Sequence, residues 1–199
     1  MSPAEPRLDA DQLRIALGDC VIGREILVLD ETTSTNDLVF GLTTAATREG
    51  LVVFAERQTA GRGQHGRQWE SAAGKGLWFS ILLRPKITPN ESPRLTSWAA
   101  ETIATNLSLD ATVKPPNDIC IANRKVAGIL LEMRAMTGEH VGILGIGVNV
   151  NHAPEDFPPE LRERAGSLAT TLGHYVDRQK LAATLLRALD SSYREAVAS

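Results

Sequence analysis

Apolar positions along the chain follow two alternating periods, one of 3.6 residues and one of two residues. Segments 8–17 and 181–197 carry apolar residues at helical spacing, which is typical of amphipathic helices packed on a core. Segments 25–29, 51–57 and 76–84 are short runs rich in Val, Leu, Ile and Phe, which predict strands. The two periods together predict a fold that combines helices with a sheet.

Two further helices have recognisable starts. Ser34 followed three residues later by Asp37 has the spacing of a helix cap, and Ser92-Pro93 places proline where a helix leaves an N–H unpaired. The buried stripe expected after Ser34 is Leu38, Val39, Leu42, Ala45 and Ala46, with Gly50 as the end of the helix. The inner face expected after Pro93 is Leu95, Trp98, Ala99, Thr102 and Ile103.

The second half of the chain reads as hairpins. Segments 119–121 and 126–131 flank a turn at Asn123-Arg124, and segment 140–150 follows a turn at 137–139. The proline-rich stretch 153–160 reads as a surface loop. Because hairpins outnumber crossovers, we expect one α+β domain over residues 1–199, with a mostly antiparallel mixed sheet flanked by helices.

Composition narrows the function classes. The net charge of −3 and pI near 5.8 argue against a chain that coats nucleic acid, and no run of about 18 apolar residues suggests a membrane span. The first residues lack the features of a secretion signal. Cys20 and Cys120 are isolated and the four histidines are scattered, so neither a disulfide nor a zinc site is expected. A cytoplasmic protein with reduced thiols is the expectation.

The stretch from Gln58 to Trp69 is the most informative part of the sequence. It reads QTAGRGQHGRQW, with three glycines and two arginines directly after a strand. Such a loop can bring backbone N–H groups and guanidinium forks close to an anion. Ser34-Thr35-Asn36 and the amide of Gln58 add neutral donors and acceptors, which suit a polar uncharged ring such as an amide or a urea.

Two later segments add charged side chains and a glycine that would let a ligand approach the backbone closely. Lys114-Pro-Pro-Asn-Asp118 combines a cation, a rigid bend and two oxygen-bearing side chains, and an aspartate beside phosphates commonly recruits magnesium. Lys125 begins a strand in which Gly128 would admit a ligand or another backbone. Segment 145–151 has the same small residues but lacks the third glycine and the helix of a dinucleotide fingerprint.

Taken together, these segments resemble the biotin protein ligases. The matching elements are Ser34-Thr-Asn36, Gln58 to Trp69, Lys114 with Pro116-Asn-Asp118, Lys125-Val-Ala-Gly-Ile-Leu-Leu-Glu132 and Gly145-Ile-Gly-Val-Asn-Val150. The resemblance implies the catalytic fold shared with class II aminoacyl-tRNA synthetases and lipoate ligases. It also implies that biotin and ATP form biotinyl-5′-AMP, which then acylates a lysine of the biotin carboxyl carrier domain of acetyl-CoA carboxylase or a related carboxylase.

The resemblance also implies roles for individual residues. Lys125 and Arg62 would be catalytic. Biotin would contact Ser34, Thr35, Asn36, Gln58, Gly61, Arg62, Gly63, Gln64, Lys125 and Gly128. The nucleotide would contact Arg67, Trp69, Lys114, Asn117, Asp118 and Asn149, and Asp118 would hold Mg²⁺. No covalent nucleophile is expected, and a homodimer formed by sheet-edge pairing is compatible with the family.

Three features differ from the usual family pattern. Gln64 stands in place of an arginine, which predicts weaker retention of the adenylate, and Pro115 stands in place of a tryptophan. The family's small C-terminal barrel has no counterpart in the residues after Asn151, so we expect a catalytic domain alone. The residues before Ser34 predict one helix, too little for a helix-turn-helix unit, so no DNA binding is expected.

Other functions remain open from the sequence. A lipoate or octanoate ligase or transferase of the same fold would act on a different acid, but Gln58 and Ser34-Thr-Asn36 favour a polar ureido group. A biotin-binding or adenylate-binding module without turnover is a non-enzymatic alternative. RNA binding through the Arg-Gly loop is disfavoured by the acidic net charge and the absence of interleaved aromatic residues.

Overall fold

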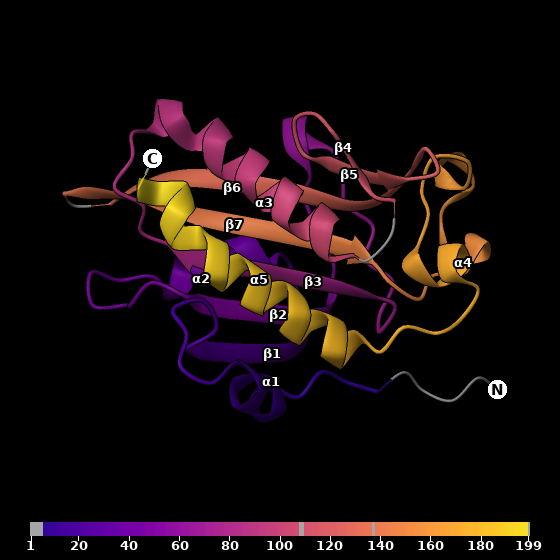
Figure 1. Ribbon diagram of the computed structural model, residues 1–199, viewed down its shortest axis with the longest axis horizontal. Coiled ribbons are helices and arrows are strands. Elements are labelled where there is room, and N and C mark those ends of the chain that lie inside the picture. Colours follow the sequence, from indigo (N-terminus) through magenta and orange to yellow (C-terminus); the bar gives the residue numbers. More distant parts are fainter. Residues whose placement is uncertain (1–5, 108–109, 137, 199) are drawn as a thin grey trace.

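A seven-stranded sheet forms the middle of the protein (Figure 1). The computed structural model describes residues 6–107, 110–136 and 138–198. The strand order is β1-β2-β3-β7-β6-β5-β4, and the bounds are β1 (Glu25–Thr32), β2 (Leu51–Gln58), β3 (Gly76–Leu83), β4 (Thr112–Lys114), β5 (Asp118–Ile121), β6 (Arg124–Met136) and β7 (Glu139–Asn149). Among the described strand pairs, β1–β2 is parallel and the rest are antiparallel. The predicted mixed, mostly antiparallel α+β fold is therefore confirmed.

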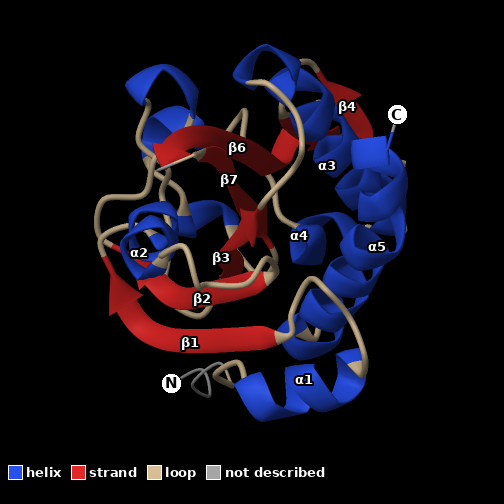
Figure 2. Cartoon of the chain, turned by 90° about the vertical axis from the view of Figure 1, so that its left-hand side faces the viewer, coloured by secondary structure: helices blue, strands red, loops and turns tan. Residues whose placement is uncertain are grey.

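Helices cover both faces of this sheet. They are α1 (Ala10–Leu17), α2 (Thr35–Leu42), α3 (Ser92–Asn106), α4 (Leu168–Leu172) and α5 (Arg178–Ala198). Figure 2 shows α3 and α5 on one side of the sheet and α2 on the other. Because β3 lies between these layers, all eight of its residues are buried. A strand buried on both faces reads as a continuous apolar run rather than an alternating one.

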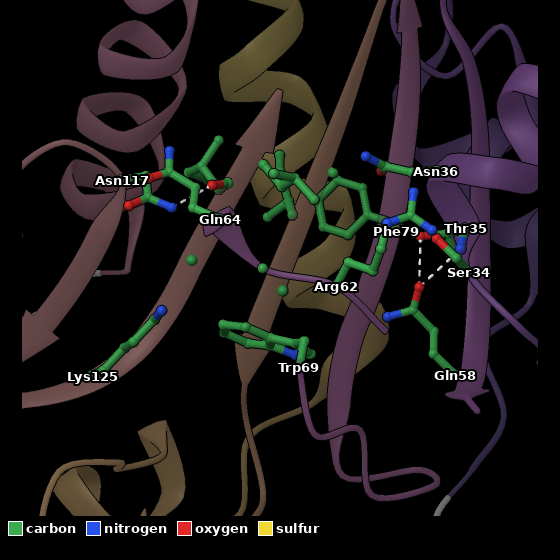
Figure 3. Close-up of a pocket in the computed structure, with 17 residues that line it drawn as sticks. Ser34, Thr35, Asn36, Gln58, Arg62, Gln64, Trp69, Phe79, Asn117 and Lys125 are labelled. Carbon is green, nitrogen blue, oxygen red and sulfur yellow. Dashed lines mark hydrogen bonds between the residues drawn. The ribbon is translucent and has the colours of Figure 1, made fainter. Parts of the chain in front are cut away.

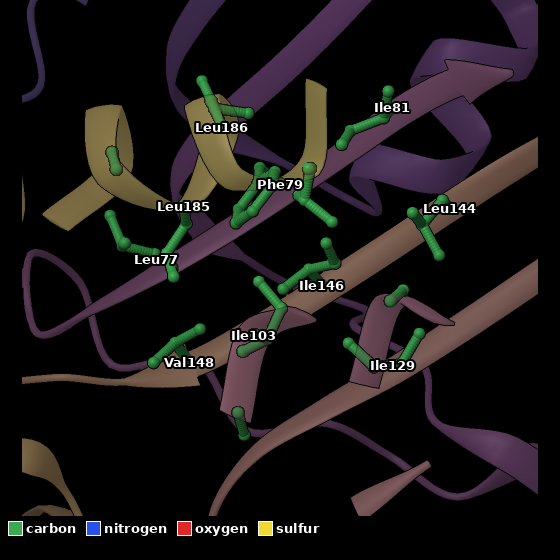
Figure 4. Packing of buried hydrophobic residues seen from close by; sticks show 14 of the residues in the cluster. Leu77, Phe79, Ile81, Ile103, Ile129, Leu144, Ile146, Val148, Leu185 and Leu186 are labelled. Carbon is green, nitrogen blue, oxygen red and sulfur yellow. The ribbon is translucent and has the colours of Figure 1, made fainter. Parts of the chain in front are cut away.

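The larger apolar core lies between the sheet and the α3–α5 layer (Figure 4). Phe79 and Ile146 from the sheet meet Ile103 from α3 and Leu185 from α5, and each is at most 3% exposed. The predicted inner faces of both helices are thus confirmed, except that the side chain of Val197 lies outside the described residues. A smaller cluster around Val39 packs α2 on the opposite face.

Hairpin turns form close to the predicted places, but the first lies one residue earlier than the predicted Asn123-Arg124, because Arg124 already belongs to β6. Ala122 and Asn123 connect β5 to β6 with φ of 48° and 63°, the left-handed conformation that a two-residue hairpin turn requires. Gly138 has a φ of 83° between β6 and β7, whereas Thr137 of that predicted turn lies outside the described residues. The long β6–β7 ladder aligns their small residues in register, with Gly128 opposite Gly147.

The prediction for the helix after Ser34 was wrong at its C-terminal end. This helix, α2, stops at Leu42, which is 41% exposed, and Ala45 and Ala46 are exposed beyond it. Thr43 ends the helix in an extended conformation, and its hydroxyl donates to the Val39 carbonyl at 2.7 Å. This side-chain bond competes with helix continuation, as is usual for threonine.

Several short elements were not predicted. They are β4, α4 and single turns of 3₁₀ helix, two of which lie in the proline-rich stretch 153–160. That stretch is a loop as expected, but Phe157 within it is buried and stacks on His152 with ring centroids 4.9 Å apart. The described helices include none long and apolar enough to cross a membrane.

Candidate active site

A pocket opens on the face of the sheet that carries α2 (Figure 3). It encloses about 470 Å³ of empty space that continues into solvent. The walls are the N-terminus of α2, the loop after β2, and the exposed faces of β6 and β7. Predicted site residues that line it are Ser34, Thr35, Asn36, Gln58, Arg62, Gly63, Gln64, Trp69, Asn117, Lys125 and Gly128. The structure therefore brings together most of the residues that the sequence singled out.

Glycines make the floor of this pocket. An added Cβ would lie 2.7 Å from the Trp69 ring at Gly128 and 2.6 Å from it at Gly147. At Gly145 it would lie 2.4 Å from Oδ1 of Asn36. Carbon atoms in contact are normally 3.5–4.0 Å apart, so only glycine lets these side chains rest on the strands. The indole of Trp69 is thus seated directly on β6 and β7.

The amide of Gln58 is oriented by the start of α2. Its Oε1 accepts from the Thr35 backbone N–H at 2.8 Å and from the Thr35 hydroxyl at 3.1 Å. Since the backbone N–H can only donate, the Oε1 end must face α2 and the NH₂ end must face away. Ser80 lies beneath, with its hydroxyl 2.7 Å from Oγ1 of Thr35 and 2.6 Å from Oδ1 of Asn36. The polar end of the pocket is therefore a preorganised hydrogen-bonding surface.

The glycine-arginine loop folds back on itself as a narrow hairpin. The backbone N–H of Trp69 donates to the Gly61 carbonyl at 2.9 Å, and the backbone N–H of Gly63 donates to the Arg67 carbonyl at 2.7 Å. An added Cβ at Gly61 would lie 2.7 Å from the Trp69 carbonyl, so the base of the hairpin needs glycine. These bonds define the conformation of a loop whose composition alone leaves it free.

Arg62 lies at the pocket wall between two carboxylates. Its guanidinium binds both oxygens of Asp37, with Nη2 to Oδ1 at 2.8 Å, and Nη2 also reaches Oε2 of Glu132 at 3.1 Å. The hydrogen bond to Asp37 raises the pKa of Arg62 above its ordinary value, and the Arg62 hydrogen bond lowers the pKa of Asp37. Both groups therefore stay charged, and the arginine is held in one orientation.

Lys125 lies at the other end of the pocket. Its Nζ is 2.6 Å from Oδ1 of Asp118 and 4.9 Å from the centroid of the Trp69 ring. The backbone of Lys125 donates to the Arg164 carbonyl at 2.7 Å and accepts from Gly166 at 2.9 Å. A distant segment thus pairs with the first residues of β6 and positions this lysine.

Five predicted site residues do not line the pocket: Gly61, Arg67, Lys114, Asp118 and Asn149. Arg67 and Lys114 are exposed, and Asp118 reaches the site through its ion pair with Lys125. Asn149 is 5% exposed, and its Nδ2 donates to the Gly166 carbonyl at 3.0 Å. Asn117 lines the pocket, but its Nδ2 donates to the Ile129 carbonyl at 2.7 Å. These two asparagines therefore hold neighbouring backbone in place.

Sequence reasoning missed Asp37 as the partner of Arg62, and it also missed Ser80 and Glu132. Glu132 could have been predicted, because every second residue of a strand shares a face and Glu132 is four residues after Gly128, which was already expected at the pocket. The pocket is also lined by Phe79, Leu130, Ile146 and Gly147. The registers of the β3–β7 and β6–β7 pairs bring these residues next to each other, and a single sequence does not reveal those registers.

A magnesium ion would find only part of a site in this protein. Among the described residues no group of three or more His, Cys, Asp or Glu side chains could hold a metal ion. Mg²⁺ is commonly bound by one or two carboxylates together with substrate phosphates. The single carboxylate of Asp118 beside Lys125 fits an ion shared with phosphates, and does not fit an ion held by protein alone.

The fold and the pocket define a class of protein: an α+β domain whose site offers fixed amide and hydroxyl groups together with Arg62 at one end and Lys125 at the other. Such a site suits a small polar acid together with a second anion. The sequence profile of the biotin/lipoate A/B protein ligase family matches residues 28–149. The chain therefore belongs to this family.

Two curated relatives cover nearly the whole chain. The bifunctional ligase/repressor BirA of Bacillus subtilis is 36% identical over 194 residues, which are 95% of this chain and 60% of the relative. The biotin–[acetyl-CoA-carboxylase] ligase of Mycobacterium tuberculosis is 33% identical over 94% of this chain and 71% of the relative. The chain thus spans about three fifths of the length of the Bacillus protein.

A solved structure shares the fold. The biotin protein ligase from Aquifex aeolicus in complex with biotin and ATP superposes with a TM-score of 0.73 at 28% identity, over 88% of this chain and 73% of that chain. The biotin–lipoate ligase fold expected from the sequence is therefore confirmed.

Proposed function

We propose that this protein is a biotin protein ligase, which activates biotin with ATP and transfers it to a lysine of a carrier domain. In the first step a biotin carboxylate oxygen attacks the α-phosphorus of ATP, and the bond to the β-phosphate breaks to release pyrophosphate. In the second step the ε-amine of the acceptor lysine attacks the acyl carbon of biotinyl-5′-AMP. The amide forms, AMP leaves, and the amine loses a proton.

The observation that carries this proposal is the meeting of two cations and a polar wall in one pocket. Arg62 and Lys125 approach the same space that Gln58, Thr35 and Ser34 line. Two anions must meet in the first step, and their repulsion falls when fixed positive groups face the developing charge in a partly dry site. Lys125 is our first choice for this role in the transition state, and Arg62 would hold the carboxylate.

The glycine-arginine loop has a purpose in this chemistry. A mixed anhydride such as biotinyl-5′-AMP hydrolyses in water, so the intermediate has to be shielded until the acceptor lysine arrives. The loop hairpin, closed by Gly61–Trp69 and Gly63–Arg67 bonds, lies over the floor of the pocket. The Nζ of Lys125 lies over the ring of Trp69, 4.9 Å from its centroid, and we expect the nucleotide to bind beside this pair.

Asp118 would hold Mg²⁺ together with phosphate oxygens. When bound, the ion would supply positive charge to the triphosphate and to the leaving pyrophosphate. The ion pair with Lys125 holds the carboxylate of Asp118 next to the pocket.

The partner in the second step would be a biotin carboxyl carrier domain, and the names of the relatives support acetyl-CoA carboxylase as its source. We place the reaction in the cytoplasm, which the free thiols Cys20 and Cys120 support.

Biotin-dependent exchange of labelled pyrophosphate into ATP tests the proposal. We expect exchange by the wild type and a loss of at least about 100-fold in Lys125→Ala, since a preorganised charge at the reacting centre is typically worth that much. Lys180→Ala is the matched control, because Lys180 is exposed in the first turn of α5 and pairs only with Asp177, just before this helix, among the ion pairs of the described residues. Exchange with lipoate instead of biotin would assign the protein to the sister activity. Absence of any exchange by folded protein would favour a binding module.

A further inference from the structure

Glu132 has an unusual number of partners for a carboxylate at the edge of a pocket. Its Oε2 accepts from Nδ2 of Asn36 at 2.7 Å and from Nη2 of Arg62 at 3.1 Å. Its Oε1 accepts from Nη2 of Arg134 at 3.0 Å. One side chain of β6 thereby joins the N-terminus of α2, the glycine-arginine loop and its own strand.

The register of β6 explains why this carboxylate reaches the pocket. Gly128, Leu130 and Glu132 are two residues apart and share the face of the strand that looks toward α2. The first two line the pocket, and the side chain of Glu132 is 24% exposed at the next position. The carboxylate of Glu132 therefore lies next to the pocket, and its hydrogen bonds go to three protein side chains.

Asn36 shows the consequence most directly. Its side chain is 5% exposed, with Nδ2 bound to Glu132 and Oδ1 within 2.6 Å of the Ser80 hydroxyl. Gly145 lies directly under it. Both polar atoms of this amide thus already have protein partners, so Asn36 fixes α2 against the sheet.

Arg62 is held in the same way. Three of its hydrogen bonds go to Asp37 and Glu132, and a guanidinium has five N–H groups, so donors remain for a ligand. The charges of Arg62, Arg134, Asp37 and Glu132 sum to zero, so the cluster fixes the arginine without adding net charge to the site.

We propose that Glu132 is a positioning residue, which sets the place of the Arg62 guanidinium and thereby the affinity of the pocket for the carboxylate of its acid substrate. This inference rests on the proposed function, because the acid is identified there as biotin. Glu132 itself would not touch the reacting atoms. It would act through Arg62, and this dependence can be measured.

The test is a double-mutant cycle on pyrophosphate exchange, with Glu132→Gln, Arg62→Gln and the double variant. Glutamine keeps the shape of the side chain and can still accept from Asn36, but the charge that faces Arg62 is lost. Since hydrogen bonds between charged groups are the stronger kind, we expect Glu132→Gln to raise KM for biotin about tenfold and to change kcat less than about threefold. Glu31→Gln is the matched control, because Glu31 pairs with Arg57 on the exposed edge of the sheet at 2.8 Å.

The cycle separates positioning from a general structural effect. If Glu132 acts through Arg62, Glu132→Gln has no further effect on KM in the Arg62→Gln background. Equal and independent effects in both backgrounds would overturn the proposal, as would a wild-type KM in Glu132→Gln. A wild type without biotin-dependent exchange would instead reject the proposed function, so the two failures are distinguishable. Thermal unfolding of all variants shows whether a rise in KM comes from a loss of fold.

Discussion

Replacement of Gly147 by alanine tests the glycine floor of the pocket. The new Cβ would lie 2.6 Å from Cε2 and 2.7 Å from Cζ2 of Trp69. Because carbon contacts are normally 3.5–4.0 Å, the indole has to move by about 1 Å. Overpacking of this kind typically costs about 1–3 kcal/mol. For a domain of this size we expect a decrease in Tm of roughly 2 to 12 °C.

The shift of Trp69 should also affect catalysis. Trp69 closes the base of the loop through its bond to Gly61 and lies against Lys125. A displacement of about 1 Å in a positioned site can reduce the rate about 100-fold, so we expect a comparable decrease in kcat/KM for pyrophosphate exchange.

Gly142→Ala provides the control in the same strand. Its added Cβ would lie 3.3 Å from Cδ1 of Leu131 and 3.5 Å from the sulfur of Met133, both on flexible side chains that can yield. The entropic gain from replacing a strand glycine is the same in both variants and cancels in the comparison. Equal Tm and equal activity for the two variants would refute the conclusion that Trp69 rests on Gly147.

Three further predictions follow from other contacts. Gln64→Arg restores a cation at the pocket wall, and we expect release of biotinyl-5′-AMP to slow about tenfold in a dissociation assay; an unchanged rate would show that Gln64 does not weaken retention. Burial lowers the pKa of His152 to about 4, so the unfolded chain binds the proton first as pH falls. We expect His152 to cost up to about 3 kcal/mol of stability between pH 6.5 and 4 and to cause no further loss below pH 4; urea unfolding should show no such loss between pH 6.5 and 4 in His152→Phe, and identical pH profiles would contradict this. Arg178→Met leaves the carboxylate of Glu56 without its buried partner, and we expect a cost of about 3–5 kcal/mol in urea unfolding. Adding Glu56→Gln to Arg178→Met should recover part of this lost stability. If the losses of the two single variants simply add in the double variant, the ion pair between Arg178 and Glu56 does not contribute as proposed.

Much of the architecture could be predicted from local patterns. Hairpins, the cap at Ser34, the helix start at Ser92-Pro93 and the apolar stripe of the last helix depend on nearby residues, and the structure has them. The end of α2 was mispredicted because Gly50 looked like a terminator. Its φ of 92° instead serves a turn in which an added Cβ would lie 1.8 Å from the Val21 carbonyl oxygen, a contact far away in the sequence.

For the site, too, local features could be predicted from the sequence and long-range contacts could not. Residues with chemical meaning in a short segment, such as Arg62 and Lys125, were found from the sequence and meet in the pocket. The partners of these residues were not found, because they depend on long-range register. Glu132 is 70 residues from Arg62, and the segment around Ala165 that pairs with Lys125 belongs to a loop with no strand pattern.

The resting pocket has its cations already balanced by acids. Arg62 faces Asp37 and Glu132, and Lys125 faces Asp118. A ligand carboxylate or phosphate gains little from net charge in such a site, since it has to share each cation with an acid that is already bound. Recognition must then depend on how well the remaining donors of each cation are aimed. We therefore expect the geometry of the carboxylates around Arg62, rather than their number, to set the affinity for the acid substrate.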